Sequence, residues 1–475
     1  MSTLTALARA EAVAAGRAVP LATVRHVHVS DRPLVLVPLA MAGEANAPLA
    51  AMAGCDRSDP TLLVVPQPRN RDQRFEFAAA LGDLLNAYVM SHTDVTEPVA
   101  VDRGRDVRHR FEDAPQVWVP NPRGVEFLRL LGRSTRFRSV EGDFAVPPSV
   151  PLLGRWLTFL ANAAEMPGSA LLVTAVQALA LHWATGQSSA EDAHLGSLLA
   201  WIVTGAAAAR AAEHGPPAGP ATDPEFDNAV LAPLMESGSV GELETVLRGQ
   251  ITPVWEQMWR ALDLLRALPA GARVGSRWAL DRDAFSAFVQ HLADGGPPQP
   301  RHDGVVAAAA RLYRLENAAA RYAAQRAFDD PLVMAEHRLT GAAFAGEVTL
   351  AQADRIDDTG RRPVLRPRIL VRTAEPVRME AGTALTSPAR AAQKATVVAV
   401  TPAGDGRTDV LLELSGGMGR RLTPEPGTVP AVGERLVLTT LSEAFRPAIA
   451  FPDPADTPWT HGGPPQPSTV ERVDP

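Results

Sequence analysis

LLVVPQPRNRDQRFEFAAALGDLLNAYVM, residues 62–90, begins with a short aliphatic run and continues, after two prolines, into a longer segment with helical spacing. The aliphatic run predicts a strand at 62–66, because it is short and is followed by a proline-rich turn. The spacing of the apolar residues that follow predicts a helix at about 72–90. These residues are Phe75, Leu81, Leu84, Leu85 and Val89. A strand that leads directly into a helix is a building unit of α/β sheets.

The same order of strand and helix extends on both sides of this stretch. ATVRHVHVS (22–30) and PLVLVPL (33–39) predict two adjacent strands before it. After it, QVWVP (116–120) predicts another strand, which is followed by a predicted helix at about 123–132. Alternating strands and helices indicate crossover connections, and therefore a parallel or mixed sheet. We expect an α/β domain over residues 1–145.

The rest of the chain predicts two further domains and a tail. Between residues 146 and 340 the strand signals disappear and amphipathic segments follow one another, so we expect an all-helical domain there. Between 341 and 450 the hydrophobic period returns to two, which predicts a small β-barrel-like domain. The tail at 451–475 is rich in proline and is expected to be extended or disordered. The predicted fold class is multidomain α+β.

The composition limits the classes of function. Of 475 residues, 46% are hydrophobic and 21% are charged, as in globular proteins. The net charge of −7 gives no overall attraction to nucleic acid or to an anionic membrane, although it is compatible with a local basic patch. Lys394 is the only lysine among 46 basic residues, which is typical of a GC-rich bacterial genome. A lone cysteine, Cys55, and the lack of an apolar run of about 18 residues predict a cytoplasmic protein that does not cross a membrane.

A short motif occurs twice in the α/β part. VPQPR (65–69) and VPNPR (119–123) each follow a hydrophobic strand and precede a helix. The prolines end the strand and fix an extended exit, because proline cannot donate to a strand ladder. Arg69 and Arg123 are therefore expected at the carboxyl ends of strands, where open α/β sheets bind ligands.

Further arginines follow each copy of the motif, and together they predict an anion-binding site. Planar guanidinium groups suit phosphate and carboxylate, and phosphate contacts position proteins on nucleic acid. The candidate anion-binding residues are Arg69, Arg71, Arg74, Arg123, Arg133, Arg136 and Arg138. The alternative is that nearby acids neutralise them in surface ion pairs. These acids are Asp72, Glu76, Glu126, Glu141 and Asp143.

The remaining motifs support weaker chemical hypotheses. His26 and His28 have the spacing of two that places both imidazoles on one face of a strand, so they are candidates for a metal site. The alternative is a half-exposed strand pair that binds no metal. Glu191 and His194 have the spacing of a di-iron motif, but only one copy exists, so we expect Glu191 to cap a helix. SGGMGRR (415–421) is glycine-rich but lacks the lysine of a P-loop, and no cofactor is predicted.

The layout of the C-terminal part is similar to that of a known module. A long predicted helix at 303–328 runs through Asp-Pro-Leu (330–332) to Gly341 and then into a strand-rich region. This arrangement resembles the stalk-and-barrel insertion of some superfamily 1 helicases. The chain lacks the helicase ATP motifs, so the resemblance implies only a nucleic-acid setting.

Three functional hypotheses follow from these patterns. The leading one is an accessory or adaptor protein that binds an anionic partner, nucleic acid or nucleotide, through the arginine-rich loops of the α/β domain. One alternative is an enzyme acting on a phosphorylated or carboxylated small molecule, with His26 or His28 as an acid–base or metal group. The other is a scaffold subunit whose helical middle docks a protein partner.

Trp255 and Trp259 lie four residues apart on a predicted helix and are expected in its core-facing stripe.

Overall fold

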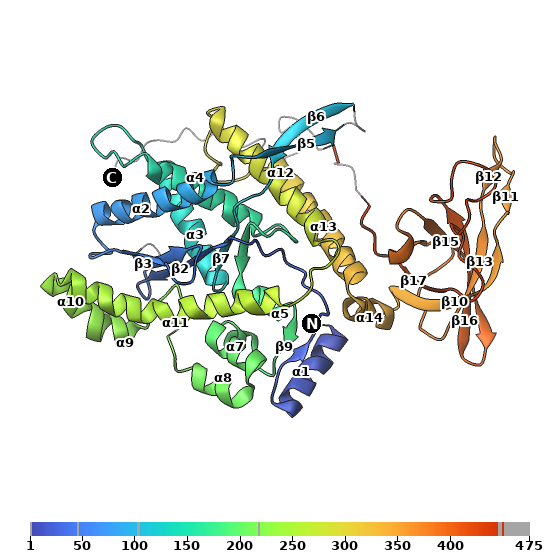
Figure 1. Cartoon of the computed structure of the whole chain (residues 1–475), viewed down its shortest axis with the longest axis horizontal. Coiled ribbons are helices and arrows are strands. Elements are labelled where there is room, and N and C mark those ends of the chain that lie inside the picture. Colours follow the sequence, from blue (N-terminus) through green and yellow to red (C-terminus); the bar gives the residue numbers. More distant parts are fainter. Residues whose placement is uncertain (1, 45–46, 102–104, 217–218, 445–448, 451–475) are drawn as a thin grey trace, which may run out of the picture.

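The protein combines a mixed β-sheet covered by helices with a second, strand-rich part at the C-terminal side (Figure 1). The computed structural model describes residues 2–44, 47–101, 105–216, 219–444 and 449–450. The α+β class predicted from the sequence is confirmed. The predicted proline-rich tail lies outside the described residues.

The central sheet has five strands in the order β4-β3-β2-β7-β8. They are β4 (Thr61–Val64), β3 (Pro48–Gly54), β2 (Leu34–Ala40), β7 (Val117–Val119) and β8 (Leu172–Thr174). β2, β7 and β8 are parallel, whereas β3 is antiparallel to both of its neighbours. β4 therefore runs in the same direction as β7. The carboxyl ends of β4 and β7 consequently lie at the same edge of a mixed sheet.

Helices cover both faces of this sheet. On one side lie α2 (Arg71–Met90), α3 (Pro122–Thr135) and α4 (Ser149–Ala163), and α3 and α4 pack against each other. On the other side the long helix α11 (Val240–Arg266) crosses beneath the strands, with α5 (Ala175–Ala180) beside it (Figure 1).

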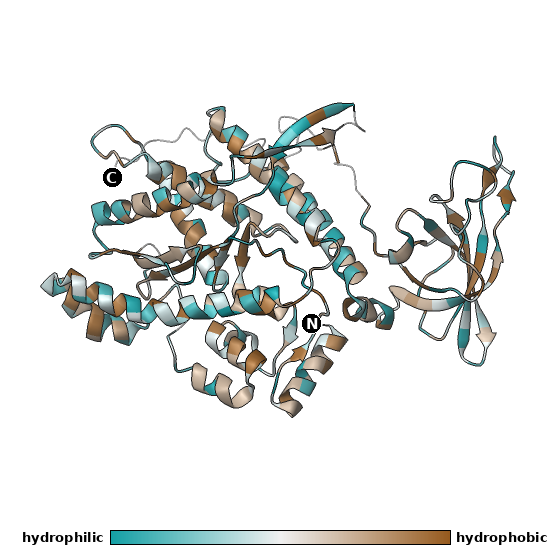
Figure 2. Ribbon diagram, viewed as in Figure 1, coloured by the Kyte–Doolittle hydropathy of each residue, from teal (hydrophilic) through white to brown (hydrophobic). Residues whose placement is uncertain are grey.

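One hydrophobic core joins the sheet to both helical layers. Trp118 of the sheet is fully buried, as are Leu81 of α2, Leu157 of α4 and Trp255 of α11, and all of them belong to one cluster. Figure 2 shows hydrophobic colouring concentrated on the strands and on the helix faces turned toward them. Segments before and after residue 146 thus share one core, and a domain boundary at that position stays a prediction.

The remaining elements of the body surround this core. The helices are α1 (Thr3–Ala15), α6 (Ser189–Asp192), α7 (Leu195–Val203), α8 (Ala206–Ala212), α9 (Pro224–Phe226), α10 (Ala232–Ser237) and α12 (Val274–Ala293), with a π-helical turn at Asp227–Leu231. Two small antiparallel pairs complete the body: β1 (Val19–Pro20) with β9 (Trp183–Ala184), and β5 (Thr96–Val101) with β6 (Asp106–Phe111).

The strand predicted at 22–30 is wrong. This segment contains only an isolated bridge at Arg25. Its backbone donors are satisfied elsewhere: Thr23 N–H donates to Asp330 Oδ2 over 2.6 Å, and His26 N–H donates to His182 Nε2 over 3.0 Å. The alternating hydrophobicity therefore marks a connector anchored by buried side chains, not a strand in a ladder.

The prediction that strands are missing from 146–340 is also wrong. The apolar segment at 169–184, which lies within the region expected to be all-helical, contains β8, α5 and β9. β8 completes the central sheet through its parallel pairing with β7. Its strand identity was hidden because a short, fully buried apolar run has no distinguishing period.

The strand-rich C-terminal part forms a closed hydrogen-bonded ring in the order β10-β13-β16-β15-β14-β17. The ring consists of β10 (Ala343–Gln352), β13 (Arg368–Thr373), β16 (Arg407–Ser415), β15 (Lys394–Gly404), β14 (Ala384–Thr386) and β17 (Arg435–Thr439). β17 pairs with both β14 and β10, which closes the circuit. Alternate residues such as Ile369, Val371, Val410 and Leu412 fill the interior. A hairpin of β11 (Ile356–Asp357) and β12 (Val364–Leu365) extends from it.

Two helices connect the body to this closed sheet. α13 (Val305–Asp329) runs along the body, and α14 (Pro331–Leu339) contacts β10 (Figure 1). Asp330 separates the two helices and caps α14, because its side chain accepts from Leu332 N–H over 2.9 Å. No helix among the described residues is long and apolar enough to cross a membrane.

Candidate anion-binding site

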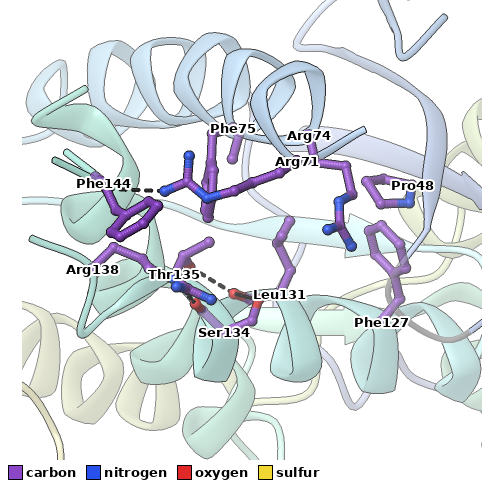
Figure 3. Close-up of a pocket in the computed structure, with 11 residues that line it drawn as sticks. Pro48, Arg71, Arg74, Phe75, Phe127, Leu131, Ser134, Thr135, Arg138 and Phe144 are labelled. Atoms are coloured by element: carbon purple, nitrogen blue, oxygen red, sulfur yellow. Dashed lines mark hydrogen bonds between the residues drawn. The ribbon is translucent and has the colours of Figure 1, made fainter. Parts of the chain in front are cut away.

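A pocket of about 530 Å³ opens between α2 and α3 (Figure 3). Its apolar walls include Phe75 from α2 and Phe127 and Leu131 from α3. Each helix begins at an asparagine whose side chain caps the first turn: Asn70 for α2 and Asn121 for α3. These caps fix where the helices start, and so which side chains face the pocket.

Three of the seven predicted anion-binding residues line this pocket. They are Arg71 and Arg74 from the first turn of α2, and Arg138 from the loop after α3 (Figure 3). Arg71 Nη2 donates to the backbone oxygen of Phe144 over 2.9 Å, and Arg71 also pairs with Asp72. Arg138 Nε donates to Ser134 O over 3.1 Å. The pocket therefore brings together arginines that lie more than sixty residues apart in the sequence.

Aromatic rings lie against these guanidinium groups. The Arg71 guanidinium carbon lies 4.7 Å from the centre of the Phe75 ring and 5.7 Å from that of Phe144. The Arg138 guanidinium carbon lies 5.3 Å from the centre of the Phe75 ring. Such contacts hold the guanidinium planes by cation–π attraction, which uses the flat face of the group and not the N–H donors at its edge.

Several arginine charges lie close enough to act on one another at the pocket. Burial and then the charges of Arg71, Arg74 and Arg301 lower the pKa of Arg138 from its usual value. Arginine stays protonated at any physiological pH, so the lowered pKa means that burial, and then repulsion from the neighbouring guanidinium groups, disfavours the charge of Arg138. An anion in the pocket would relieve that repulsion.

Arg301 belongs to the same cluster, although it was not among the predicted anion-binding residues. It lies in the proline- and glycine-rich segment GGPPQPRHDG (295–304), between α12 and α13. The buried Arg136 side chain holds this segment, with Nε donating to Gln299 O over 2.9 Å and Nη2 donating to Pro300 O over 3.0 Å. Arg301 then lies 5.1 Å from the centre of the Phe137 ring. A contact between segments so far apart leaves no local pattern in the sequence.

The other predicted arginines do not line the pocket. Arg69 forms an ion pair with Glu44 and its side chain is 76% exposed. Arg123 lies in the first turn of α3 and is exposed, and Arg133 is exposed in its last turn. Arg136 is buried as an anchor of the neighbouring loop.

The two copies of the repeated motif, VPQPR (65–69) and VPNPR (119–123), are not structurally equivalent. They leave the same edge of the sheet, as β4 and β7 run in the same direction. However, α2 begins at Arg71, two residues after Arg69, whereas α3 begins at Pro122, one residue before Arg123. The two matching arginines therefore occupy different positions relative to their helices, and the pocket uses residues further along the chain.

His26 and His28 have different neighbours. His26 is buried, stacks on His182, and lies 3.5 Å from Asp330 through Nε2. His28 stacks on Trp278, with ring centres 4.1 Å apart. Burial lowers the pKa of His26 to about 3 and that of His28 to about 4, so both are neutral at physiological pH. Within the residues that the structure describes, no group of three His, Cys, Asp or Glu side chains could hold a metal ion.

Two other motifs have structural roles. Trp255 and Trp259 are buried in the core, as expected, so neither ring is available for stacking on a ligand. Glu191 forms a capping box with Ser188 at the start of α6, which confirms the capping interpretation. Asp192 beside it pairs with Arg9 of α1.

Comparison with known proteins gives no relative: no family model, curated protein or solved structure matches this chain.

Proposed function

We propose that this chain is an accessory or adaptor protein that binds an anionic partner, nucleic acid or nucleotide, in the cleft between α2 and α3. The observation that carries the proposal is the convergence of Arg71, Arg74 and Arg138 on one pocket that also has aromatic walls. Guanidinium groups suit phosphate oxygens, and aromatic rings suit the flat faces of bases.

The size and lining of the pocket support a ligand with both an anionic and an apolar part. A volume of about 530 Å³ lies within the range of small-molecule sites, which runs from about 300 to 1,000 Å³. Phe75, Phe127 and Leu131 would contact the apolar part, while the arginines at the rim would contact the charge. A bare inorganic ion would leave the apolar wall unused.

The experiment is to titrate the protein into fluorescently labelled oligonucleotides and follow anisotropy at several salt concentrations. R71A and R138A are each expected to weaken binding about tenfold or more, because each removes a charge-assisted contact. Each should also reduce the salt slope by about one if the lost contact is with a phosphate. R248A is the matched control, because Arg248 is an exposed arginine that pairs with Glu244 on α11, away from the cleft.

Two results would contradict the proposal. One is an absence of binding to any single-stranded or duplex DNA or RNA, or to nucleotides, at low salt. The other is that R71A and R138A bind as tightly as R248A does. The binding site would then lie elsewhere on the chain.

A further inference from the structure

Guanidinium groups and phenylalanine rings continue beyond the pocket as a connected series, which we name the arginine–phenylalanine ladder. Its first part joins Phe144, Arg71, Phe75 and Arg138. Its second part contains Arg301, Phe137 and Arg136, where both arginines contact the Phe137 ring, Arg136 at 4.7 Å and Arg301 at 5.1 Å from its centre. Arg138 follows Phe137 directly in the chain, and the charge of Arg301 acts on Arg138. The two parts are therefore adjacent.

Two rings of the ladder are exposed. The Phe144 side chain is 66% exposed and Phe137 is 42% exposed, and Val140 between them in the chain is 47% exposed. Large apolar side chains that gather on a surface mark an interaction site more often than chance placement does. Rings that also lie beside cations are suited to flat ligands that carry negative charge.

The loop that carries these rings is held in place. Val146 N–H donates to Ser139 O over 3.0 Å, and the Ser139 hydroxyl donates to Glu141 O over 2.8 Å. Val146 itself is buried, and Arg71 holds the backbone of Phe144. The exposed rings thus lie on an ordered loop. The protein therefore loses little conformational entropy when a ligand stacks on them.

Two charges of the ladder, those of Arg138 and Arg301, are not paired with carboxylates as many arginines elsewhere in the chain are. In the closed sheet, Arg368, Arg372 and Arg390 each pair with a carboxylate. Among the described residues, no carboxylate lies within ion-pair distance of Arg138 or Arg301, and Nη1 of the buried Arg136 has no hydrogen-bond partner. The acids nearest in sequence are Asp72, which pairs with Arg71, Asp303, which pairs with Arg311, and the exposed Glu141 and Asp143.

We infer that the ladder binds single-stranded nucleic acid, with bases stacked on Phe137 and Phe144, backbone phosphates at Arg71, Arg138 and Arg301, and one nucleotide in the pocket. This inference rests on the proposed function and specifies its ligand. A single strand offers unpaired bases to the exposed rings, whereas a duplex keeps its bases stacked inside. A mononucleotide would occupy only the pocket and leave Phe137 and Arg301 without contact.

The test is a length series of labelled oligothymidine and oligouridine strands, with thymidine monophosphate and a duplex of matched length for comparison. Affinity is expected to rise with length over the first few nucleotides and then level off, and the duplex is expected to bind more weakly than the single strand. F144A and F137A are each expected to weaken binding of the longer strands at least fivefold, since base–aromatic stacking supports an effect of that size. F144W should retain binding, because the ring is kept. L312A is the control, because Leu312 is an exposed apolar residue of α13 outside the ladder.

The outcomes separate this inference from the proposed function. If the monophosphate binds as tightly as the strands, F137A and F144A have no effect, and R71A and R138A still abolish binding, then the ladder inference is overturned and the proposed function stands. If a duplex binds more tightly than a single strand, the ladder inference is likewise overturned. If no nucleic acid or nucleotide binds, both are overturned.

Thermal unfolding of F137A and F144A checks that lost binding does not come from lost folding. A large drop in their melting temperature would overturn the claim that these rings are displayed for a ligand.

Discussion

Asp281 on α12 is a buried carboxyl group whose ionisation opposes folding. Its Oδ2 accepts from Ala170 N–H over 2.7 Å, at the entry to β8. Burial raises the pKa of Asp281 to about 7, from 3.8 in an unfolded chain. Between these two values the folded protein binds more protons than the unfolded chain, so the stability that Asp281 provides is present near pH 4 and is lost as the pH rises through 7.

D281N should therefore stabilise the protein at high pH. Asparagine keeps an oxygen that can accept from Ala170 N–H but has no ionisable proton. The free energy of unfolding is expected to increase by up to about 4 kcal/mol near pH 8, and much less near pH 5. Urea unfolding of both proteins at the two pH values measures this. A loss of stability at both values would contradict the raised pKa and would show that Asp281 is ionised in the fold, the form that the charge of Arg277 favours.

His28 and His182 give a pH dependence of the opposite sign. Burial lowers the pKa of His28 to about 4 and that of His182 to about 4, below the usual 6.5. The unfolded chain binds more protons than the folded one between about pH 4 and 6.5, so these groups reduce stability as the pH falls through that window.

H28F tests the contribution of one of these rings. Phenylalanine can keep the stacking on Trp278 but cannot be protonated. H28F is expected to lose less stability than the wild type between pH 6.5 and 4.5, as measured by urea unfolding at each pH. Equal losses in the two proteins would mean that His28 does not resist protonation in the fold.

At the scale of elements, the contact between α3 and α4 positions the arginine loop. Gly154 on α4 faces the end of α3 so closely that a Cβ atom there would lie 2.6 Å from Thr135 Oγ1 and 2.5 Å from the Cα atom of Arg136. The loop that carries Phe137, Arg138 and Phe144 begins directly after this contact.

G154A is expected to separate the two helices. The added methyl group has no space and backbone atoms cannot yield cheaply, so we expect a destabilisation of about 1 to 3 kcal/mol, together with weaker oligonucleotide binding. G249A on α11 is the matched control, because no atom lies within 4 Å of its added Cβ and alanine favours a helix. Thermal unfolding and anisotropy measure both effects. A G154A protein as stable as G249A would show that α3 and α4 lie further apart.

Local sequence patterns predicted the elements that have strong patterns of their own. The hydrophobic period and the positions of the prolines correctly predicted β2, β4, β7, α2 and α3. β3 was missed because its sequence PLAAMAG has alanines in place of β-branched residues, and it is a strand only because it pairs with β2 and β4.

The site was predictable only in part. The local density of arginines pointed to Arg71, Arg74 and Arg138, which the fold brings to one pocket. The repeated motif pointed to Arg69 and Arg123, but the helices that follow start at different offsets, so those two lie outside it. Arg301 depends on a contact between distant segments, which no period or spacing in one sequence encodes.

At the scale of the whole molecule, the charge distribution is uneven in a way that the net charge of −7 conceals. The closed sheet keeps many of its arginines in ion pairs with acids, including Glu413, Asp409 and Glu434. The cleft between α2 and α3 keeps a group of guanidinium charges close enough to repel one another. An acidic chain can therefore carry a local anion site, and binding to it should be strongly salt-dependent.

The strand-rich C-terminal part carries a second group of exposed arginines. Arg361 and Arg362 are exposed near the β11–β12 hairpin, and Arg420 and Arg421 are exposed in the glycine-rich loop after β16. α13 and α14 link this part to the body, and Arg273 strengthens the link by pairing with Asp329 and Glu443. Which of the two surfaces binds is thus a question about the intact chain.

Photocrosslinking of the full-length protein to a single strand that contains thiouridine, followed by mass spectrometry of the crosslinked peptides, answers that question most directly. We expect the crosslinks to fall in the segment that carries Phe137 and Phe144 and in the first turns of α2, and to be lost in R71A. Crosslinks confined to the peptides that contain Arg361 and Arg362, or Arg420 and Arg421, would contradict the assignment of the binding site to the cleft between α2 and α3.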